Sequence, residues 1–363
     1  MKKLSVCVLF GGRSPEHEVS LRSAESVLNN MDPEKYNIFP VGITKSGNWM
    51  LYGSRDYSKL PTGEWEHCPE NRQAAISPIR GQGLLNFEGD CVVRERIDVV
   101  FPVLHGENGE DGTIQGLFEL ARIPYVGCGV LGSAVCMDKA VANTIMDAAG
   151  VPHCKWASAI RAELEGDHKT LLDSIEQRLG YPIFVKPANA GSSVGITKAT
   201  DRAVLEQAVV TALKEDDKVV FEEFIDGQEV ECAAIGNPDD PATVSTTRPG
   251  EILAGAEFYT YDDKYKNGVS QTVIPAHLSE EKLDEVRTEA RRAYLALGCA
   301  GLSRFDFFVE RGTGRVLCNE MINLPGFTYI SMYPKLMEHE GLSYAQLVDR
   351  LLQLALHRRK GAY

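Results

Sequence analysis

The first third of the chain repeats one unit, in which an apolar strand leads through a glycine-rich loop into an amphipathic helix. The first apolar run covers residues 4–10 and ends at a Gly-Gly pair, and a helical pattern starts at Glu18. A second run covers residues 97–104 and leads through the loop ENGEDG into the helical segment TIQGLFELA. Strands that alternate with helices form parallel sheets whose loops bind ligands. The N-terminal part is therefore predicted to be a parallel-sheet domain of an α/β protein.

The rest of the chain continues with helical and strand-like segments. Residues 52–95 read as a polar, turn-rich insertion with one or two strands. Helices are expected near 137–150, 167–179 and 201–214 and from Ser279, and strands at YPIFVKP and, as antiparallel strands, at KVVFEEFI and QEVECAAIG. A length of 363 residues exceeds one ordinary core, so two or three domains are expected.

Composition and charge restrict the class of protein. Hydrophobic residues make up 44% of the chain and charged residues 25%, as in globular proteins. Acidic residues outnumber basic ones by 51 to 38, and the formal charge of −13 argues against a nucleic-acid partner. No apolar run approaches the roughly 18–20 residues of a membrane span, and the N-terminus carries no secretory pattern. None of the nine cysteines forms a C-x-x-C pair. A cytoplasmic protein without a membrane partner is expected, with buried reduced thiols at Cys7, Cys136, Cys232 and Cys318.

The segment FVKPANAGSSVGITKA, residues 184–199, indicates a ligand. Lys186 ends a predicted strand, and the glycines and serines after it expose backbone N–H groups and hydroxyls. Such a loop beside a lysine suits a polyphosphate, although it is not a Walker loop. Gly191–Gly195 also matches the G-x-S-x-G of serine hydrolases, but the segment after Ser193 reads as a strand where that motif requires a helix. A glycine turn without a ligand is the remaining alternative.

Two further stretches place carboxylates on predicted strands. Residues 219–233, VVFEEFIDGQEVECA, read either as a solvated acidic hairpin or as a strand that contacts adenine and ribose. Residues 301–320 read as a hairpin with Arg304 and Asp306 on one face and Glu320 on the partner strand. Arg304 either pairs with Asp306 alone, or cations bridge Asp306 and Glu320, because a carboxylate in an apolar setting such as that of Glu320 needs a partner. Oxygen ligands beside a phosphate loop indicate Mg²⁺ rather than zinc.

Seven segments, in this order and at these spacings, resemble the D-alanine–D-alanine ligases of the ATP-grasp superfamily over essentially the whole chain. They are GGRSPEHEVSL, HGENGEDGTIQG, CMDK, VKPANAGSSVG, DKY, SRFDFF and NEMINLPGFTYISMYPKL. The resemblance implies an α/β protein with α+β lobes in a three-domain ATP-grasp fold: an N-terminal pre-ATP-grasp domain with a parallel sheet at 1–123, a central lobe at 124–221 and a C-terminal lobe with the metal and substrate sites at 222–363. It also implies that ATP phosphorylates the carboxylate of one D-alanine and that the amine of a second D-alanine displaces the phosphate.

The same resemblance assigns roles to individual residues. Catalytic roles fall to Glu16, Ser192, Tyr265, Arg304 and Gly326. ATP would be bound by Lys139, Lys186, Ser192, Ser193, Glu222, Glu223, Phe224, Ile225, Glu229 and Lys264. Two D-alanine molecules would be bound by Glu16, His105, Arg304, Gly326, Ser331 and Met332, and two Mg²⁺ ions, which Mn²⁺ can replace, by Asp306, Glu320 and Asn323. A turn histidine is the alternative for His105, although we favour a place near the first substrate. The segment 258–268 would close as a lid over the acyl phosphate and exclude water, with Tyr265 bonded to Ser192 and Glu16.

One position departs from the family's pattern. That pattern continues after the catalytic glutamate as Asn-Glu-x-Asn-Thr/Ser-x-Pro-Gly, and its second asparagine ligates magnesium. Here Ile322 occupies that place and Asn323 follows it, so the second metal site is in doubt. Either a bulge before Pro325 re-aims Asn323, or water and phosphate oxygens fill the gap, and we favour the second because Mg²⁺ readily keeps several waters.

The sequence therefore predicts a D-alanine–D-alanine ligase of peptidoglycan precursor synthesis, and relatives suggest a homodimer. A tyrosine in the lid favours an amine nucleophile, because ester-forming relatives carry a histidine there. Met332 stands where D-serine-using relatives often carry arginine. The alternatives are a D-alanine–D-serine ligase, a nucleotide-binding paralogue weakened at Ile322, and a serine hydrolase built on Gly191–Gly195.

Overall fold

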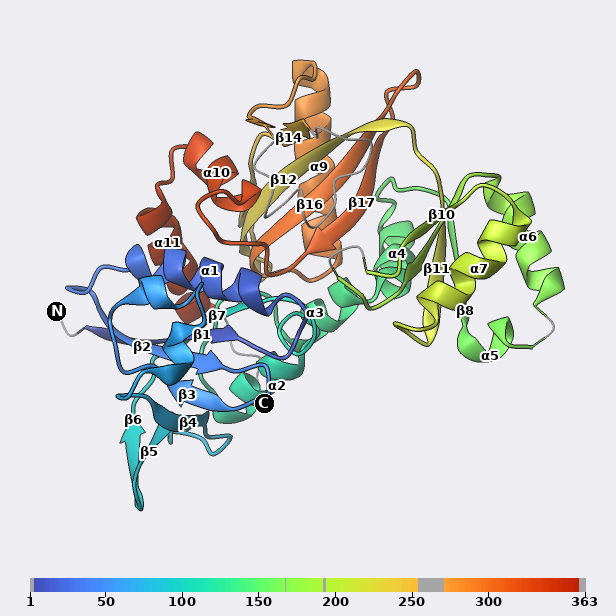
Figure 1. Cartoon of the computed structure of the whole chain (residues 1–363). Helices are drawn as coiled ribbons and strands as arrows, with labels where there is room; N and C mark the ends of the chain where they lie inside the picture. The colour runs from blue at the N-terminus through green and yellow to red at the C-terminus, as the bar shows by residue number, and fades with distance from the viewer. Residues whose placement is uncertain (1–2, 167, 192–193, 254–270, 359–363) are drawn as a thin grey trace.

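The residues that the structure describes form three β-sheets, which follow one another along the chain (Figure 1). The computed structural model describes residues 3–166, 168–191, 194–253 and 271–358. Strands of the first sheet lie between residues 4 and 104, those of the second between 156 and 223, and those of the third between 227 and 322. The domain boundaries expected after residues 123 and 221 stay a prediction; β11 of the second sheet runs on to Glu223.

The first sheet is parallel only at one end. Its order is β6-β5-β4-β3-β2-β1-β7, with β1 (Leu4–Gly11), β2 (Tyr36–Ile43), β3 (Trp49–Leu51), β4 (Arg72–Ile76), β5 (Leu84–Glu88), β6 (Cys91–Glu95) and β7 (Val99–Leu104). β1 pairs in parallel with β2 and β7, and α1 (His17–Asn29) and α2 (Thr113–Ala121) follow β1 and β7, as predicted.

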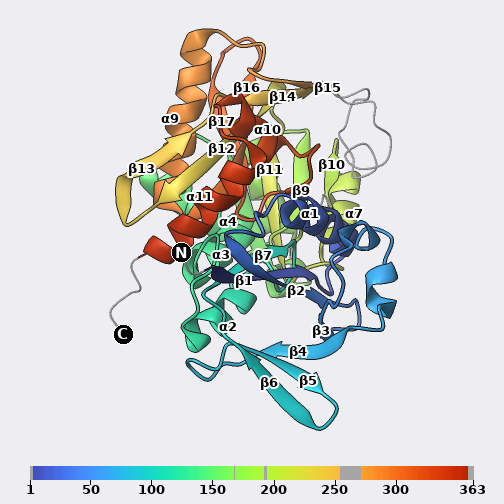
Figure 2. The ribbon, with the colours of Figure 1, turned by 90° about the vertical axis from the view of Figure 1, so that its left-hand side faces the viewer.

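The insertion at 52–95 holds more regular structure than expected. We predicted one or two strands, but β4, β5 and β6 all lie there and extend the sheet by antiparallel pairing (Figure 2). Two short 3-10 helices, η1 (Tyr57–Lys59) and η2 (Glu64–His67), precede them. β6 exposes most of its side chains, so it lacks the apolar alternation by which a half-buried strand is recognised.

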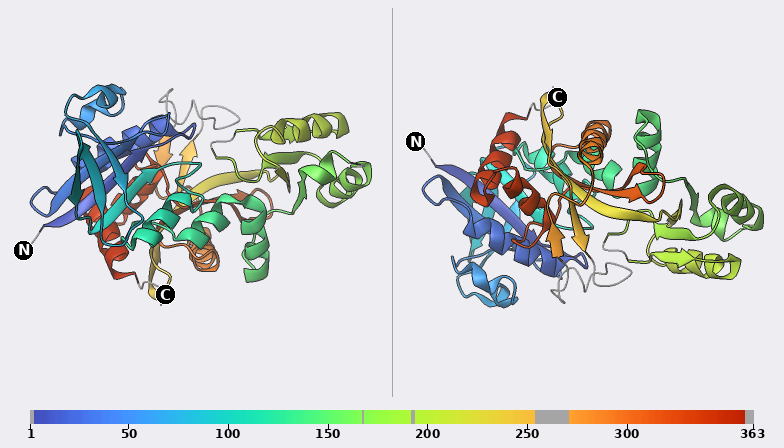
Figure 3. Two further views of the ribbon diagram at one scale, coloured as in Figure 1. Left: turned by 90° about the horizontal axis from the view of Figure 1, so that it is seen from below. Right: turned by 90° about the horizontal axis from the view of Figure 1, so that it is seen from above.

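The second sheet forms a lobe that projects to one side of the molecule (Figure 3). Its order is β10-β9-β11-β8, with β8 (Trp156–Ile160), β9 (Ile183–Pro187), β10 (Thr197–Ala199) and β11 (Lys218–Glu223). The accompanying helices are α5 (Arg161–Leu164), α6 (Lys169–Leu179) and α7 (Arg202–Ala212). Because strand β10 follows the serine-rich loop, the helix that a G-x-S-x-G elbow requires is absent at 197–199, which argues against the serine hydrolase.

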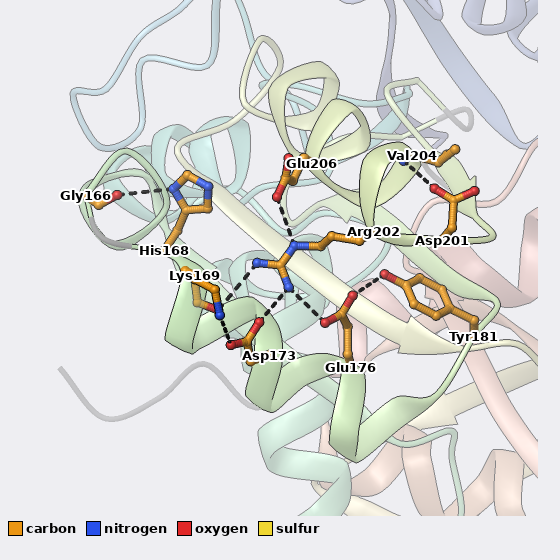
Figure 4. A network of polar contacts seen from close by, with 10 residues as sticks. All are labelled: Gly166, His168, Lys169, Asp173, Glu176, Tyr181, Asp201, Arg202, Val204 and Glu206. Atoms are coloured by element: carbon orange, nitrogen blue, oxygen red, sulfur yellow. Dashed lines mark hydrogen bonds and ion pairs between the residues drawn. The ribbon is translucent and has the colours of Figure 1, made fainter.

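A network centred on Arg202 joins the helices of this lobe (Figure 4). Its Nη1 donates to Asp173 and Glu176 of α6, at 2.8 Å each, and its Nε donates to Glu206 at 2.9 Å. Partly exposed ion pairs of this kind contribute only about 0–1 kcal/mol each. The network therefore fixes how α6 and α7 lie on their shared apolar core more than it stabilises the lobe.

The third sheet carries one apolar and one polar face. Its order is β15-β14-β12-β16-β17, with β13 paired to β12. The strands are β12 (Gly227–Asn237), β13 (Asp240–Thr246), β14 (Gly250–Leu253), β15 (Gln271–Val273), β16 (Gly301–Glu310) and β17 (Val316–Ile322). Burial alternates along β16, so Phe305 and Phe307 pack against α9 (Glu280–Ala296) while Arg304 and Asp306 face away from that helix. The hairpin predicted at 301–320 is confirmed.

The last helix returns to the first sheet and joins the two ends of the chain in one core. α10 (Met332–His339) and α11 (Tyr344–His357) follow the third sheet, and Leu347 and Leu351 of α11 lie in the same buried cluster as Val6 and Val99. Two more helices, α3 (Val130–Met137) and α4 (Lys139–Ala149), connect the first and second sheets. None of the helices described is long and apolar enough to cross a membrane.

The cysteines are free thiols, as expected. All nine lack a disulfide partner, and the four in apolar strings are buried: Cys7, Cys136, Cys232 and Cys318. Burial raises the pKa of Cys7 to about 12, so its thiol stays protonated at neutral pH.

The role of α11 can be tested by truncating one buried side chain. Leu351→Ala removes a fully buried side chain from the core that joins α11 to the first sheet. It should lower the free energy of unfolding by about 2–5 kcal/mol, measured by urea denaturation. Gln353→Ala, at an exposed position of the same helix, is the control and should change it by less than about 0.5 kcal/mol. Equal effects of the two substitutions would contradict this core.

Candidate active site

A cavity of about 160 Å³ collects residues from loops and strands that are far apart in the chain. The loops after β1 and β7 form one wall, the start of α4 and the loop after β9 a second, and the polar face of β12, β16 and β17 a third. Nine residues predicted for the site line it: Glu16, His105, Lys139, Arg304, Glu320, Asn323, Gly326, Ser331 and Met332. The structure therefore brings together the predicted substrate residues and two of the three predicted metal ligands, from five sequence segments.

Glu16 lies between two loops, each of which approaches its carboxylate at a glycine. It follows β1 and precedes α1. A Cβ atom on Gly106 would lie 2.8 Å from Glu16 Oε2, and one on Gly191 would lie 3.1 Å from the same oxygen. Gly106 also has a backbone φ of +71°, which residues other than glycine rarely adopt. The carboxylate thus sits at the junction of the loop after β7 and the loop after β9.

Both ring nitrogens of His105 are occupied by protein groups. Nδ1 lies 3.0 Å from the Leu324 carbonyl and Nε2 lies 3.2 Å from Ser23 Oγ. A neutral ring fits this arrangement, with Nδ1 donating to the carbonyl and Nε2 accepting from the hydroxyl. Burial lowers the pKa of His105, although the charge of Glu16 acts in the opposite direction. His105 therefore lines the cavity as a link between two loops.

Glu110 lines the cavity but was not among the predicted site residues. Its Oε2 accepts a hydrogen bond from the Gly106 N–H at 2.7 Å, and its Oε1 accepts one from the Leu324 N–H at 3.3 Å. Burial, together with the nearby charge of Glu16, raises the pKa of Glu110 to about 8. It lies within the loop ENGEDG, but a carboxylate in a polar loop gives no sign from sequence alone that it is buried.

Two lysines face the cavity and the β17 strand beside it. The Asp138 side chain caps α4, so Lys139 begins that helix, and its Nζ donates to the Ala190 carbonyl at 2.8 Å and lies 3.4 Å from Glu320 Oε1. Lys186 Nζ lies 2.5 Å from Glu222 Oε2. Burial, the largest single effect, would lower the pKa of Lys186, but the charge and hydrogen bond of Glu222, together with the charge of Glu320, raise it overall, so the lysine is charged.

The residues predicted for adenine and ribose lie on β11, on β12 and in the connection between them, and none of them lines this cavity. Glu222 is buried, and Glu223 accepts from the Lys155 N–H at 2.8 Å. Phe224 is 38% exposed, with Lys198 Nζ 4.1 Å from its ring centroid. Ile225 is buried, and Glu229 is exposed on β12. The alternative prediction of a solvated acidic hairpin at residues 219–233 is wrong. Strands β11 and β12 belong to different sheets, and the Glu222 carboxylate is buried against Lys186.

Three carboxylates lie in register across three strands on the polar face of the third sheet. Asp306 of β16 pairs with Glu231 of β12 on one side and with Glu320 of β17 on the other. Arg304 Nε and Nη2 donate to the two oxygens of Asp306, each at 2.7 Å, and Arg304 Nε lies 3.0 Å from Glu231 Oε2. Glu231 is the second residue that sequence reasoning missed. Its position follows from the strand pairing, which the sequence does not give.

The donor groups on this face fit one Mg²⁺ ion and are incomplete for a second. Asp306 and Glu320 offer carboxylate oxygens, and Mg²⁺ in proteins is usually held by one or two carboxylates, water and phosphate. Ile322 lies opposite Arg304 at the cavity wall, where it offers no oxygen. Asn323 is 2% exposed, and its Nδ2 donates to the Glu110 carbonyl at 2.8 Å. Among the residues described, no three His, Cys, Asp or Glu side chains gather as a metal group.

The pairing of β16 and β17 contains an irregularity, but it does not lie before Pro325, where a bulge was considered as the alternative. The register of β16 and β17 shifts between Cys318 and Glu320, whereas the bulge we considered would lie before Pro325. Ser192, Ser193, Lys264 and Tyr265, with the lid segment 258–268, lie outside the described residues.

Comparisons with known proteins agree over nearly the full length. A family model described as "D-ala D-ala ligase N-terminus" matches residues 5–128, and one described as "D-ala D-ala ligase C-terminus" matches residues 145–353. A D-alanine–D-alanine ligase of Acetivibrio thermocellus is 48% identical, covering 98% of this chain and 96% of that protein. One from Caldicellulosiruptor bescii is 45% identical, covering 99% and 97%.

Solved structures give the same fold. The VanG D-Ala:D-Ser ligase from Enterococcus faecalis has a TM-score of 0.87 at 39% identity, covering 98% of this chain and 100% of that one. The D-alanine–D-alanine ligase from Coxiella burnetii has a TM-score of 0.83 at 34% identity, covering 98% and 94%. The fold is thus that of the ATP-grasp ligases, and the chain belongs to the D-alanine–D-alanine ligase family.

Proposed function

We propose that this protein is an ATP-dependent ligase that joins two D-alanine molecules through a D-alanyl phosphate, for peptidoglycan precursor synthesis. The observation that carries the proposal is the cavity itself. The cavity is lined by Glu16, whose carboxylate would bind the ammonium group of an amino acid. It is also lined by the cations Lys139 and Arg304 and by the acid Glu320. The relatives' names, at 44–48% identity over nearly the whole chain, support the same reaction.

The cationic side of the cavity suits transfer of a phosphoryl group. Phosphoryl transfer depends on positioning and on neutralising charge. Lys139 and Lys186 lie on either side of the glycine-rich loop and would neutralise the polyphosphate of ATP. Glu16 would hold the ammonium of the first D-alanine, so that its carboxylate faces the γ-phosphate.

The attack of the second D-alanine needs stabilisation of an oxyanion. Arg304 and the N–H of Gly326 line the cavity and would bind the oxygen on which negative charge develops. Ser331 is the N-cap of α10, and Met332 is its first residue. The carboxylate of the second D-alanine would lie at this helix N-terminus, where backbone N–H groups favour an anion.

Asp306 and Glu320 would hold magnesium. In the second site, Ile322 occupies the position of the family's ligating asparagine and offers no side-chain oxygen. We propose two ions, which Mn²⁺ can replace, the second completed by water and phosphate oxygens because of Ile322. When bound, the metal neutralises charge on the phosphates. Glu320 would be shared between the two ions. It pairs with Asp306 across the two strands, and its Oε1 lies 3.4 Å from Lys139 Nζ.

We also propose a cytoplasmic homodimer that binds neither nucleic acid nor membranes. The formal charge of −13 supports the absence of a nucleic-acid surface. The second candidate function is D-alanine–D-serine ligation, which the VanG structure favours by its name at 39% identity. The relatives at 44–48% identity are D-alanine–D-alanine ligases, and Met332 stands where an arginine often marks D-serine users, so D-alanine is the preferred second substrate.

The reaction is tested by measuring ADP release with ATP and Mg²⁺ in the presence and absence of D-alanine, and by identifying the product by mass spectrometry. We expect D-alanine-dependent ADP release and D-alanyl-D-alanine, with little mixed dipeptide when D-serine competes at equal concentration. ADP release that ignores D-alanine, or release without dipeptide, would contradict the proposed function. A dominant D-alanyl-D-serine product would favour the second candidate.

The second metal site yields a prediction at Ile322. Ile322→Asn restores an oxygen ligand at the cavity wall, so the free Mg²⁺ giving half-maximal activity should fall several-fold. Glu320→Gln removes the shared carboxylate and should abolish activity in either background. An Ile322→Asn variant with an unchanged Mg²⁺ requirement would contradict the water-filled site, and a fully active Glu320→Gln variant would contradict the metal role of Glu320.

Glu110 yields a prediction about pH. Its pKa is about 8 in the folded protein and has the ordinary value of 4.5 when unfolded, so only the folded state holds this proton between those values. Stability should therefore fall as pH rises from about 4.5 to 8, by at most about 1.4 kcal/mol per pH unit from this group. Glu110→Gln removes the titration, and its amide oxygen can keep the bond from Gly106. Urea midpoints of the two proteins that vary identically with pH would contradict the assignment.

A further inference from the structure

We propose that Glu231 is a positioning residue, which holds Arg304 in place and so releases Asp306 to bind magnesium. The inference rests on the proposed function, in which Asp306 is a metal ligand and Arg304 stabilises the oxyanion. Nothing in the family's motif as seen in this sequence points to Glu231. Its role follows from where three neighbouring strands place their charges.

Arg304 contacts two carboxylates in the structure. It takes both oxygens of Asp306 in a two-pronged contact, at 2.7 Å each, and its Nε also lies 3.0 Å from Glu231 Oε2. The side chains of Arg304 and Glu231 are each only 13% exposed. Charge-assisted bonds of this geometry are among the strongest in proteins, so the guanidinium is well fixed as long as the acids remain.

A magnesium ion on Asp306 would compete electrostatically with Arg304. The two-pronged contact uses one lone pair on each Asp306 oxygen, and a magnesium ion would take one of the remaining lone pairs. Two cations on one carboxylate repel each other. Binding of magnesium should therefore weaken the contact between Arg304 and Asp306, and a second anion beside the guanidinium offsets that loss.

Glu231 is placed to be that anion. It lies in the middle of β12, opposite Asp306 in the strand register, between the buried residues Val230 and Cys232. Its carboxylate lines the same cavity, on the side of Asp306 away from Glu320. Glu320 lies 3.4 Å from Lys139, whereas Glu231 lies 3.0 Å from Arg304.

The proposal is tested by metal binding without turnover. Mn²⁺ binding is titrated by electron paramagnetic resonance in the presence of a non-hydrolysable ATP analogue. Glu231→Gln keeps the side-chain shape but removes the charge, so Arg304 should stay on Asp306 and the Mn²⁺ affinity should fall about tenfold or more. Glu310→Gln removes one charge from the same sheet, at its contact with Arg315, and should leave the affinity unchanged.

A double substitution separates positioning from a simple loss of charge. In an Arg304→Met background no guanidinium competes for Asp306, so Glu231→Gln should change Mn²⁺ affinity less than about twofold. Thermal unfolding of each variant verifies that it is folded. An unchanged affinity in Glu231→Gln, or an equal loss in both backgrounds, would overturn the proposal. If the unaltered protein shows no nucleotide-dependent Mn²⁺ binding, the proposed function fails, and this inference with it.

Discussion

The opposition of charges on one face of the third sheet is the constraint on which the site depends. Glu231, Asp306 and Glu320 lie side by side across three strands, and Arg304 and Lys139 approach them from two directions. Carboxylates this close repel each other unless cations lie between them. Arg304 and Lys139 offset this repulsion, and in the proposed site bound magnesium would offset it further.

The rest of the fold positions the residues that surround this face of the sheet. Strand alternation on β16 sends its aromatic side chains to α9 and its charged ones to the cavity. The loop after β7 contacts the segment that follows β17 through His105, which bonds to the Leu324 carbonyl, and through Glu110, which accepts from the Leu324 N–H. The return of α11 to the first sheet gives both regions a common core. The walls of the cavity are thus fixed by bonds between segments about 200 residues apart in the chain.

Local patterns in the sequence predicted the elements, and the family resemblance supplied most of the residues that line the cavity, but neither gave their contacts. The strand–loop–helix repeat gave β1, β7 and the helices after them, and period-two alternation put Arg304 and Asp306 on one face. Glu231 and Glu110 were missed because their roles arise from strand pairing and from burial by distant loops. His105 was predicted to lie near the first substrate, yet both of its ring nitrogens bond to protein groups, a fact that depends on Ser23 and Leu324.

The central claim is that this cavity activates a carboxylate by phosphorylating it. It is tested most directly with D-alanine labelled with ¹⁸O in its carboxylate, by measuring the label in the inorganic phosphate released during turnover. An acyl phosphate requires one ¹⁸O atom to leave with each phosphate as the dipeptide forms. The account predicts that transfer, and dipeptide formed with unlabelled phosphate would contradict it.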